Sequence, residues 1–204
     1  MAWCRIGILA ITLATSQPNP TLANHSQPLP LVLFVTPAGE IAIEVNVAKA
    51  PVTSANFLQY VDGGWYNEGR FHRTVRPDTE TNRAHPIQVI QASRRRTARG
   101  EGPTWPAVTL ERTRDTGLTH VDGAVSMARV AGRPDSASSD FFIAIGPQPA
   151  LDFGGARNDD GQGFAVFGRV VSGMDVVKKI QAAPVRPGTQ TLEPPVTITA
   201  ARRR

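Results

Sequence analysis

Several short stretches of the chain alternate apolar and polar residues, which is the pattern of half-buried β-strands. Residues 31–35 and 41–47 are two such stretches, and the turn-forming sequence 36–39 separates them. Together they predict a β-hairpin at the start of the folded region. Runs of β-branched and aromatic residues predict further strands, at 71–75, 87–93, 108–110, 124–129 and 139–143.

One segment changes to helical periodicity. Its apolar residues, in 51–61, recur near the spacing of an α-helix, Pro51 stands in the first turn, and Gly63 follows the last apolar residue. Proline is favoured at the start of a helix and glycine just after its end. The pattern therefore predicts an α-helix over 51–61, which would cover one open end of a barrel or sheet.

Two polar residues interrupt these apolar strands. Arg73 lies within the strand 71–75, and Gln91 lies within the strand 87–93. An arginine stays protonated in a protein, so it must lie at a rim, pair with a carboxylate, or face a site where a fixed donor is useful. On neighbouring strands the two side chains would share one polar site. A solvated, outward-facing arginine is the alternative interpretation.

Residues 1–23 have the organisation of a secretory signal peptide. Arg5 precedes the apolar run 6–14, which is too short to span a bilayer, and small residues end the segment at Ala23. We expect cleavage after Ala23, with residues 14–16 as a second possibility. A buried N-terminal strand or helix is the alternative.

After cleavage, residues 24–204 would form the mature domain. Cleavage would also remove Cys4, the single cysteine of the chain. A chain without cysteine suits export to an oxidising compartment, so we expect a periplasmic or secreted protein with no membrane span in its mature form.

The composition favours one β-rich domain. The 18 glycines and 17 prolines interrupt the apolar runs throughout the chain, and about 180 residues are enough for a single core. The net charge of +5 comes largely from arginine clusters at 94–96 and 202–204. Because no stacking aromatic residues alternate with these arginines, a solvated basic surface is favoured and nucleic acid is not an expected partner.

Other site chemistries are disfavoured. His72 and the serine-serine-aspartate run 138–140 resemble parts of a hydrolase triad, but the chain has no Gly-x-Ser-x-Gly elbow, and simple alternation turns His72 away from Arg73. The four histidines show no close ligand spacing, so no metal site is expected. The sequence 158–161 resembles a fragment of a calcium loop without its later glutamate, and a solvated turn is favoured.

Six motifs follow one another along the chain. They are Phe71-His-Arg73, Ile87-Gln-Val-Ile-Gln91, Gly123-Ala-Val-Ser-Met-Ala-Arg129, Ser138-Ser-Asp-Phe-Phe-Ile143, Ala150-Leu-Asp152 and Phe164-Ala-Val-Phe-Gly-Arg-Val170. In this order, over roughly residues 30–183, the chain resembles the cyclophilin-type peptidyl-prolyl isomerases, and most of all their bacterial exported members.

The resemblance implies a fold. The expected architecture is mainly β, a closed eight-stranded antiparallel β-barrel capped by two α-helices, with a proline-binding groove on its outer face. Residues 174–180 would form the second helix, and residues 196–199 would supply the last strand.

The resemblance also implies a set of site residues. Arg73 matches the catalytic arginine of the family, and Phe142 matches the phenylalanine at the floor of its proline pocket. The backbones of Ala128 and Arg129 match positions that bind the extended peptide. The other groove positions are matched by Val89, Gln91, Asp140, Leu151 and Phe164.

Three of the matched positions differ from the usual residues of the family. Asp140 replaces a glutamine, Ala150 stands where an aromatic residue is common, and Phe164 replaces a histidine or tyrosine. The acidic replacement is the one that bears on activity, because a carboxylate beside Arg73 would pair with it and withdraw its donors.

The expected activity is isomerisation of X-Pro bonds in proline-containing polypeptides, during the folding of exported proteins. We expect a monomer, and this chemistry requires no metal or cofactor. At the twisted transition state the proline nitrogen regains a lone pair, and a donor from Arg73 would bond to it only there. The alternative is a cyclophilin-like module that binds peptides, or acts as a chaperone, with weak turnover.

Overall fold

The computed structural model describes residue 1, residues 28–96 and residues 105–204. The predicted signal peptide, apart from its first residue, and its cleavage site lie outside this part of the chain, so they stay predictions. Within the described ranges, no helix combines the length and the apolar character that crossing a membrane requires.

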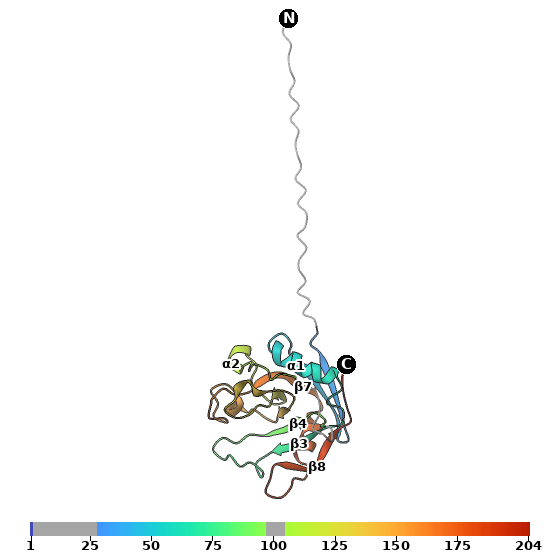
Figure 1. The fold of residues 1–204 in the computed structure, drawn as a ribbon, viewed down its shortest axis with the longest axis vertical. Helices are drawn as coiled ribbons and strands as arrows, with labels where there is room; N and C mark the ends of the chain where they lie inside the picture. Colours follow the sequence, from blue (N-terminus) through green and yellow to red (C-terminus); the bar gives the residue numbers. More distant parts are fainter. Residues whose placement is uncertain (2–27, 97–104) are drawn as a thin grey trace.

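One curved sheet of nine antiparallel strands forms a nearly closed barrel (Figure 1). The strands are β1 (Leu31–Thr36), β2 (Gly39–Val45), β3 (Gly69–Val75), β4 (Val89–Ser93), β5 (Ala124–Met127), β6 (Phe141–Ala144), β7 (Ala165–Ser172), β8 (Thr191–Ile198) and β9 (Ala200–Arg203). Their order in the sheet is β8-β3-β4-β6-β5-β7-β2-β1-β9. The expectation of a mainly β, antiparallel barrel is confirmed, and the predicted hairpin is β1 and β2.

The barrel has nine strands where eight were expected, because the last segment is divided. β8 pairs with β3 and β9 pairs with β1, so the chain crosses from one edge of the sheet to the other at Thr199. The backbone N–H and the hydroxyl of Thr199 both donate to the carbonyl of Val35, at 2.8 and 3.0 Å. The prediction of a last strand at 196–199 is therefore wrong in extent, because 191–198 and 200–203 form the last two strands. Arg202 and Arg203 lie on the closing strand β9 and are exposed, as expected of a solvated basic surface.

Two helices cover the barrel, as expected. α1 (Pro51–Asp62) packs on β7 and β9, and α3 (Met174–Gln181) packs on β2, β3 and β4. The one-turn helix α2 (Thr113–Thr116) and two short 3₁₀ turns, at Pro134–Ser136 and Pro149–Leu151, were not predicted. The expected strand at 108–110 is wrong, because Val108 forms only an isolated bridge to Ala137.

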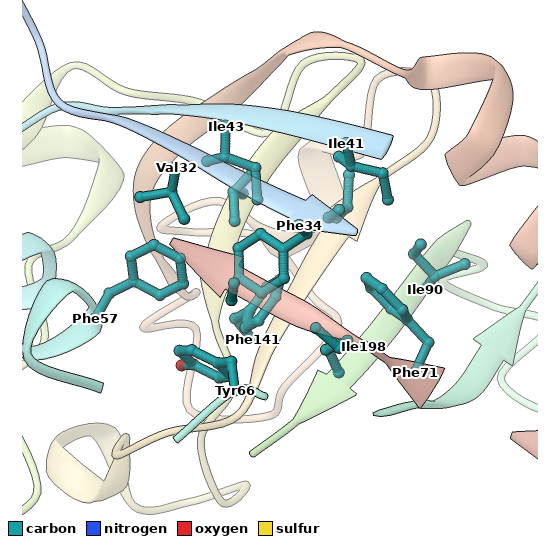
Figure 2. Close-up of a cluster of buried hydrophobic side chains, with 14 of the residues drawn as sticks. Val32, Phe34, Ile41, Ile43, Phe57, Tyr66, Phe71, Ile90, Phe141 and Ile198 are labelled. Atoms are coloured by element: carbon teal, nitrogen blue, oxygen red, sulfur yellow. The ribbon is translucent and has the colours of Figure 1, made fainter. Parts of the chain in front are cut away.

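Aromatic rings fill the interior of the barrel, as Figure 2 shows. The rings of Phe34 and Phe141 lie 5.4 Å apart between centroids, and Phe57 of α1 lies 4.7 Å from Phe167. Tyr66 donates its buried hydroxyl to the carbonyl of Ser139 at 2.6 Å, so its one polar group is satisfied. We call the buried apolar cluster to which Phe34, Phe57, Tyr66, Phe141 and Phe167 belong the inner core.

A β-bulge in β3 decides which side chains reach the outer surface. Phe71 pairs with Ala92 and Arg73 pairs with Gln91, so His72 is an extra residue without a partner on β4. In a regular strand, residues 71 and 73 would face the same side. Here Phe71 is buried in the inner core, whereas Arg73 lines a cavity on the outer face.

Candidate functional site

A cavity of about 240 Å³ opens on the outer face of the sheet, over β3, β4 and β6. Its apolar wall belongs to a second cluster that is separate from the inner core. We call it the outer cluster, and its buried members are Val75, Ile87, Val89, Phe142 and Leu151. A larger hollow of about 440 Å³ lies beyond Ile87. None of the predicted site residues lines it.

The floor of the cavity is the ring of Phe142. Phe164, which precedes β7, packs perpendicular to it with ring centroids 5.3 Å apart. The imidazole of His120 stacks on it at 5.8 Å. Ala150, which replaces the usual aromatic residue, also packs against the outer cluster. The floor is therefore held by rings on two sides.

Arg73 lies at the polar edge of the same cavity and is fixed by two glutamines. Its Nε and Nη2 both donate to Oε1 of Gln190, at 2.9 and 2.6 Å, and its Nη1 donates to Oε1 of Gln91 at 3.0 Å. Three of the five N–H groups of the guanidinium are used in this way. Both acceptors are neutral, so, as far as the described part of the chain is concerned, two N–H groups and the full positive charge remain for a ligand.

Burial lowers the pKa of Arg73, and the neighbouring Arg157 lowers it further, while Glu80 opposes the shift. An arginine nevertheless stays protonated, because its ordinary pKa lies far above neutral pH. The site thus holds a partly desolvated cation beside an apolar wall. In such surroundings a hydrogen bond from the cation to a ligand is stronger than it is in water.

Sequence reasoning missed Gln190. It lies in the turn that leads into β8, 117 residues from Arg73, and it donates its amide N–H to the carbonyl of Thr79 at 3.0 Å. The prediction that Arg73 and Gln91 share one polar site is confirmed by their hydrogen bond. That prediction was possible because both residues lie on recognisable strands. A glutamine in a turn carries no such signal.

Ala128 and Arg129 border the cavity, but their roles differ. The N–H of Ala128 already donates to the carbonyl of Asp140 at 2.8 Å, so it is not free for a peptide. The guanidinium of Arg129 is fully buried; it forms a bidentate pair with Asp160 at 2.8 and 2.7 Å, and it lies over the ring of Phe164. This pair fixes the loop that carries Phe164, so the turn at 158–161 is not simply solvated.

Asp140 does not lie where we expected it. It lines a neighbouring cavity together with His72, Ser93 and Arg96, and within the described residues it makes no hydrogen bond to Arg73. Burial raises the pKa of its carboxyl, and the nearby His72 opposes the shift. Asp140 lies two residues before Phe142 and lines the same cavity as His72, on the far side of that residue from the cavity of Arg73. The expectation that it withdraws the donors of Arg73 is wrong.

His72 lines the neighbouring cavity with Asp140 and is not among the residues that line the cavity of Arg73, in agreement with the expectation that it points away from Arg73. A different histidine carries a triad-like chain: Nδ1 of His120 lies 2.7 Å from Oδ1 of Asp152, and its Nε2 lies 3.0 Å from Oγ of Ser126. Ser126 lies on β5 opposite Phe142 of the neighbouring β6 and is fully buried, so its hydroxyl cannot reach a substrate. These hydrogen bonds between Asp152, His120 and Ser126 support the floor of the cavity and do not create a nucleophile.

Comparison with known proteins agrees with this architecture. The family model described as cyclophilin type peptidyl-prolyl cis-trans isomerase/CLD matches residues 31–203. A peptidyl-prolyl cis-trans isomerase A of Dickeya dadantii is 34% identical over 200 residues, covering 97% of this chain and 93% of that protein. A peptidyl-prolyl cis-trans isomerase of Acinetobacter baylyi is 35% identical over 163 residues, covering 80% and 78%.

The fold is similar to that of a solved cyclophilin type isomerase from Cryptosporidium parvum. The two superpose with a TM-score of 0.66 at 18% sequence identity, over 86% of this chain and 98% of that one.

Proposed function

The chain belongs to the cyclophilin-type peptidyl-prolyl cis-trans isomerases, and we propose that it catalyses this isomerisation in the cavity beside Arg73, on exported proteins as they fold. The observation that carries the proposal is the position of Arg73. Its guanidinium is fixed by two neutral glutamines, keeps unused N–H groups, and lies at the edge of an apolar pocket.

The chemical problem is the double-bond character of the peptide bond. Rotation must overcome about 18–20 kcal/mol, and uncatalysed X-Pro exchange takes roughly tens to hundreds of seconds. When the bond is twisted by a quarter turn, its resonance is lost and the proline nitrogen becomes a hydrogen-bond acceptor. A group that binds this nitrogen in the twisted form lowers the barrier.

Arg73 supplies such a group. Because the planar ground state offers no lone pair on nitrogen, a bond from Arg73 to that atom forms only in the transition state, and the interaction is differential. Gln91 and Gln190 hold the donor in place, so little reorganisation is needed when the substrate twists.

The outer cluster supplies the second part of the mechanism. Phe142, Val89 and Leu151 would hold the proline ring and exclude water, which strengthens the bond from Arg73. The residue preceding proline is then free to turn about the fixed ring. This route uses no proton transfer and no covalent intermediate.

Export is the second part of the proposal. It is supported by the signal-like pattern of residues 1–23, and we expect the mature N-terminus near Asn24. Mass spectrometry of the envelope fraction should detect this terminus. Recovery of the full-length chain from the cytosol would contradict export and leave the enzymatic proposal intact. We also expect a monomer that acts without nucleic acid, which sedimentation of the purified protein can check.

The test of activity is the exchange rate of a short X-Pro peptide with and without the mature protein. We expect acceleration, and loss of most of it in Arg73→Ala with the fold retained by circular dichroism. Unchanged catalysis by a folded Arg73→Ala protein would refute the role of the arginine. The alternative, a peptide-binding module with weak turnover, depended on Asp140 pairing with Arg73, and this contact is not present between the two residues in the structure.

A further inference from the structure

A second guanidinium reaches the cavity. Arg157, from the loop between Leu151 and β7, lines the same space as Arg73 and Phe142, and only 12% of its side chain is exposed. The side-chain hydrogen bonds that it makes to described residues all use Nη1, which donates to Oε2 of Glu80 at 2.9 Å and to the carbonyl of His85 at 2.8 Å. Its Nε and Nη2 are left for a ligand.

Glu80 holds Arg157 in this position. Its carboxylate is 3% exposed and accepts the N–H groups of Ile87 and Asn82, at 2.9 and 2.8 Å. Burial opposes ionisation of this carboxyl, but these backbone bonds and the bond from Arg157 outweigh it and lower its pKa. The ion pair is thus anchored to the loop that precedes β4, and its geometry does not depend on a flexible surface chain.

The charges around the cavity do not cancel. Glu80 balances Arg157, and Asp160 balances Arg129, but Arg73 is bonded only to glutamines. Of the other nearby carboxylates, Asp140 lines the neighbouring cavity, Asp152 is bound to His120, and Asp159 is exposed in a separate hollow. Among the described residues, one positive charge therefore remains uncompensated in a partly desolvated groove.

The register of the strands places Arg157 at a defined end of the groove. Ala128 is bonded to Asp140, before the start of β6, whereas Glu80 is bonded to Ile87, before the start of β4. Because β4 and β6 are antiparallel, with Val89 opposite Ala144, these two positions lie at opposite ends of the strand pair. A peptide that meets Ala128 and Arg129 on one side of its proline therefore approaches Arg157 on the other side.

We propose that Arg157 forms a carboxylate-binding subsite next to the proline pocket, so that the enzyme prefers X-Pro segments with an acidic side chain on the side of proline away from Ala128. The free Nε and Nη2 of Arg157 form a fork that matches a carboxylate. The nearby charge of Arg73 favours the same ligand. The inference rests on the proposed function, since it concerns the substrate of the same cavity.

The experiment compares matched peptides. All peptides share one neutral X-Pro core. Each carries a single Glu, Gln or Lys, placed at one of the two positions before the proline or one of the two positions after it. Exchange spectroscopy gives kcat/KM for each peptide. On one side of the proline we expect Glu to be preferred over Gln by about threefold to tenfold, and Lys to be the poorest. Arg157→Gln should abolish this preference, and Arg157→Lys should keep part of it. Arg169→Gln, which changes an exposed arginine of β7 paired with Glu44, should leave the preference unchanged.

Equal rates for Glu and Gln peptides at every position would overturn the subsite, as would a preference that persists in Arg157→Gln. If that variant does not fold, the wild-type protein still decides: added salt should reduce the Glu over Gln ratio, and a ratio insensitive to salt would overturn the proposal. Failure to accelerate even the Gln peptides would instead refute the isomerase assignment to this cavity.

Discussion

Phe141 and Phe142 are neighbours on β6, but they belong to two different clusters. Phe141 points into the inner core, where rings from β1, α1 and the turn before β3 surround it (Figure 2). Phe142 points outward and forms the floor of a cavity that is open on one side and polar at its edge. The same residue type, one position apart, therefore packs in the interior on one face of the sheet and lines the proposed substrate pocket on the other.

The two regions also differ in what holds them. The inner core is held by contacts among apolar side chains from regular elements. The outer cavity takes its rigid groups, Arg73, Gln91 and Phe142, from three adjacent strands. Its loop groups are each fastened by hydrogen bonds, as Gln190 is to Thr79. The inner core should thus tolerate little change in volume, whereas the outer cavity should be sensitive to the placement of hydrogen bonds.

The largest expected effect separates the two phenylalanines. Phe141→Ala should lower the free energy of unfolding by about 3–5 kcal/mol, because it leaves a cavity among closely packed rings. Phe142→Ala should cost less stability, since its ring already borders an open space, but should lose most of kcat/KM for an X-Pro peptide. Urea unfolding and exchange spectroscopy measure the two quantities. Similar stability losses, with catalysis preserved in Phe142→Ala, would remove the distinction between the clusters.

A second effect concerns the placement of Arg73. Gln190→Ala removes the acceptor of two of its hydrogen bonds, and we expect kcat/KM to fall by about tenfold, equivalent to roughly 1.4 kcal/mol, with stability nearly unchanged. Gln59→Ala makes the same change at an exposed glutamine of α1 and serves as the control. An undiminished kcat/KM in Gln190→Ala would show that the strand alone positions the guanidinium.

A smaller effect is a dependence of stability on pH. Burial lowers the pKa of His120, although Asp152 opposes the shift. Below about pH 6.5 the unfolded chain therefore binds a proton that the folded chain does not, so stability should decrease as the pH falls, by up to about 1.4 kcal/mol per unit for this group. His120→Asn should show a shallower decrease over the same range in urea unfolding. Parallel curves for the two proteins would exclude His120 as a source of the dependence.

Local patterns in the sequence were sufficient for much of the fold. The hairpin, α1 and the strand that carries Phe142 follow from periodicity and from proline and glycine positions, which are properties of short segments. The division of the last segment into β8 and β9 could not be predicted in this way. It depends on Thr199 meeting the distant β1, and strand propensity does not report such a pairing.

The candidate site shows the same limit more sharply. Arg73 was predictable because a charged residue within an apolar strand is unusual. The outward orientation of the Arg73 side chain depends on the bulge at His72. This bulge exists only because β3 has one more residue than β4 where the two strands pair. That bulge, together with the position of Asp140 before β6, explains why the expected pairing of Asp140 with Arg73 was wrong. Gln190 and Arg157 come from loops, where no periodicity marks a residue as part of a site.

The central claim is that Arg73 acts on the twisted transition state and contributes little to binding of the planar substrate. Nuclear magnetic resonance titration of one X-Pro peptide gives its Kd, and exchange at saturating protein gives the rate of isomerisation on the enzyme. For Arg73→Ala we expect the rate to fall by about a hundredfold to a thousandfold, as for loss of a donor to a developing charge, while Kd changes by less than about fivefold. A weaker Kd with an unchanged rate on the enzyme would show that Arg73 only binds substrate, and would contradict the account.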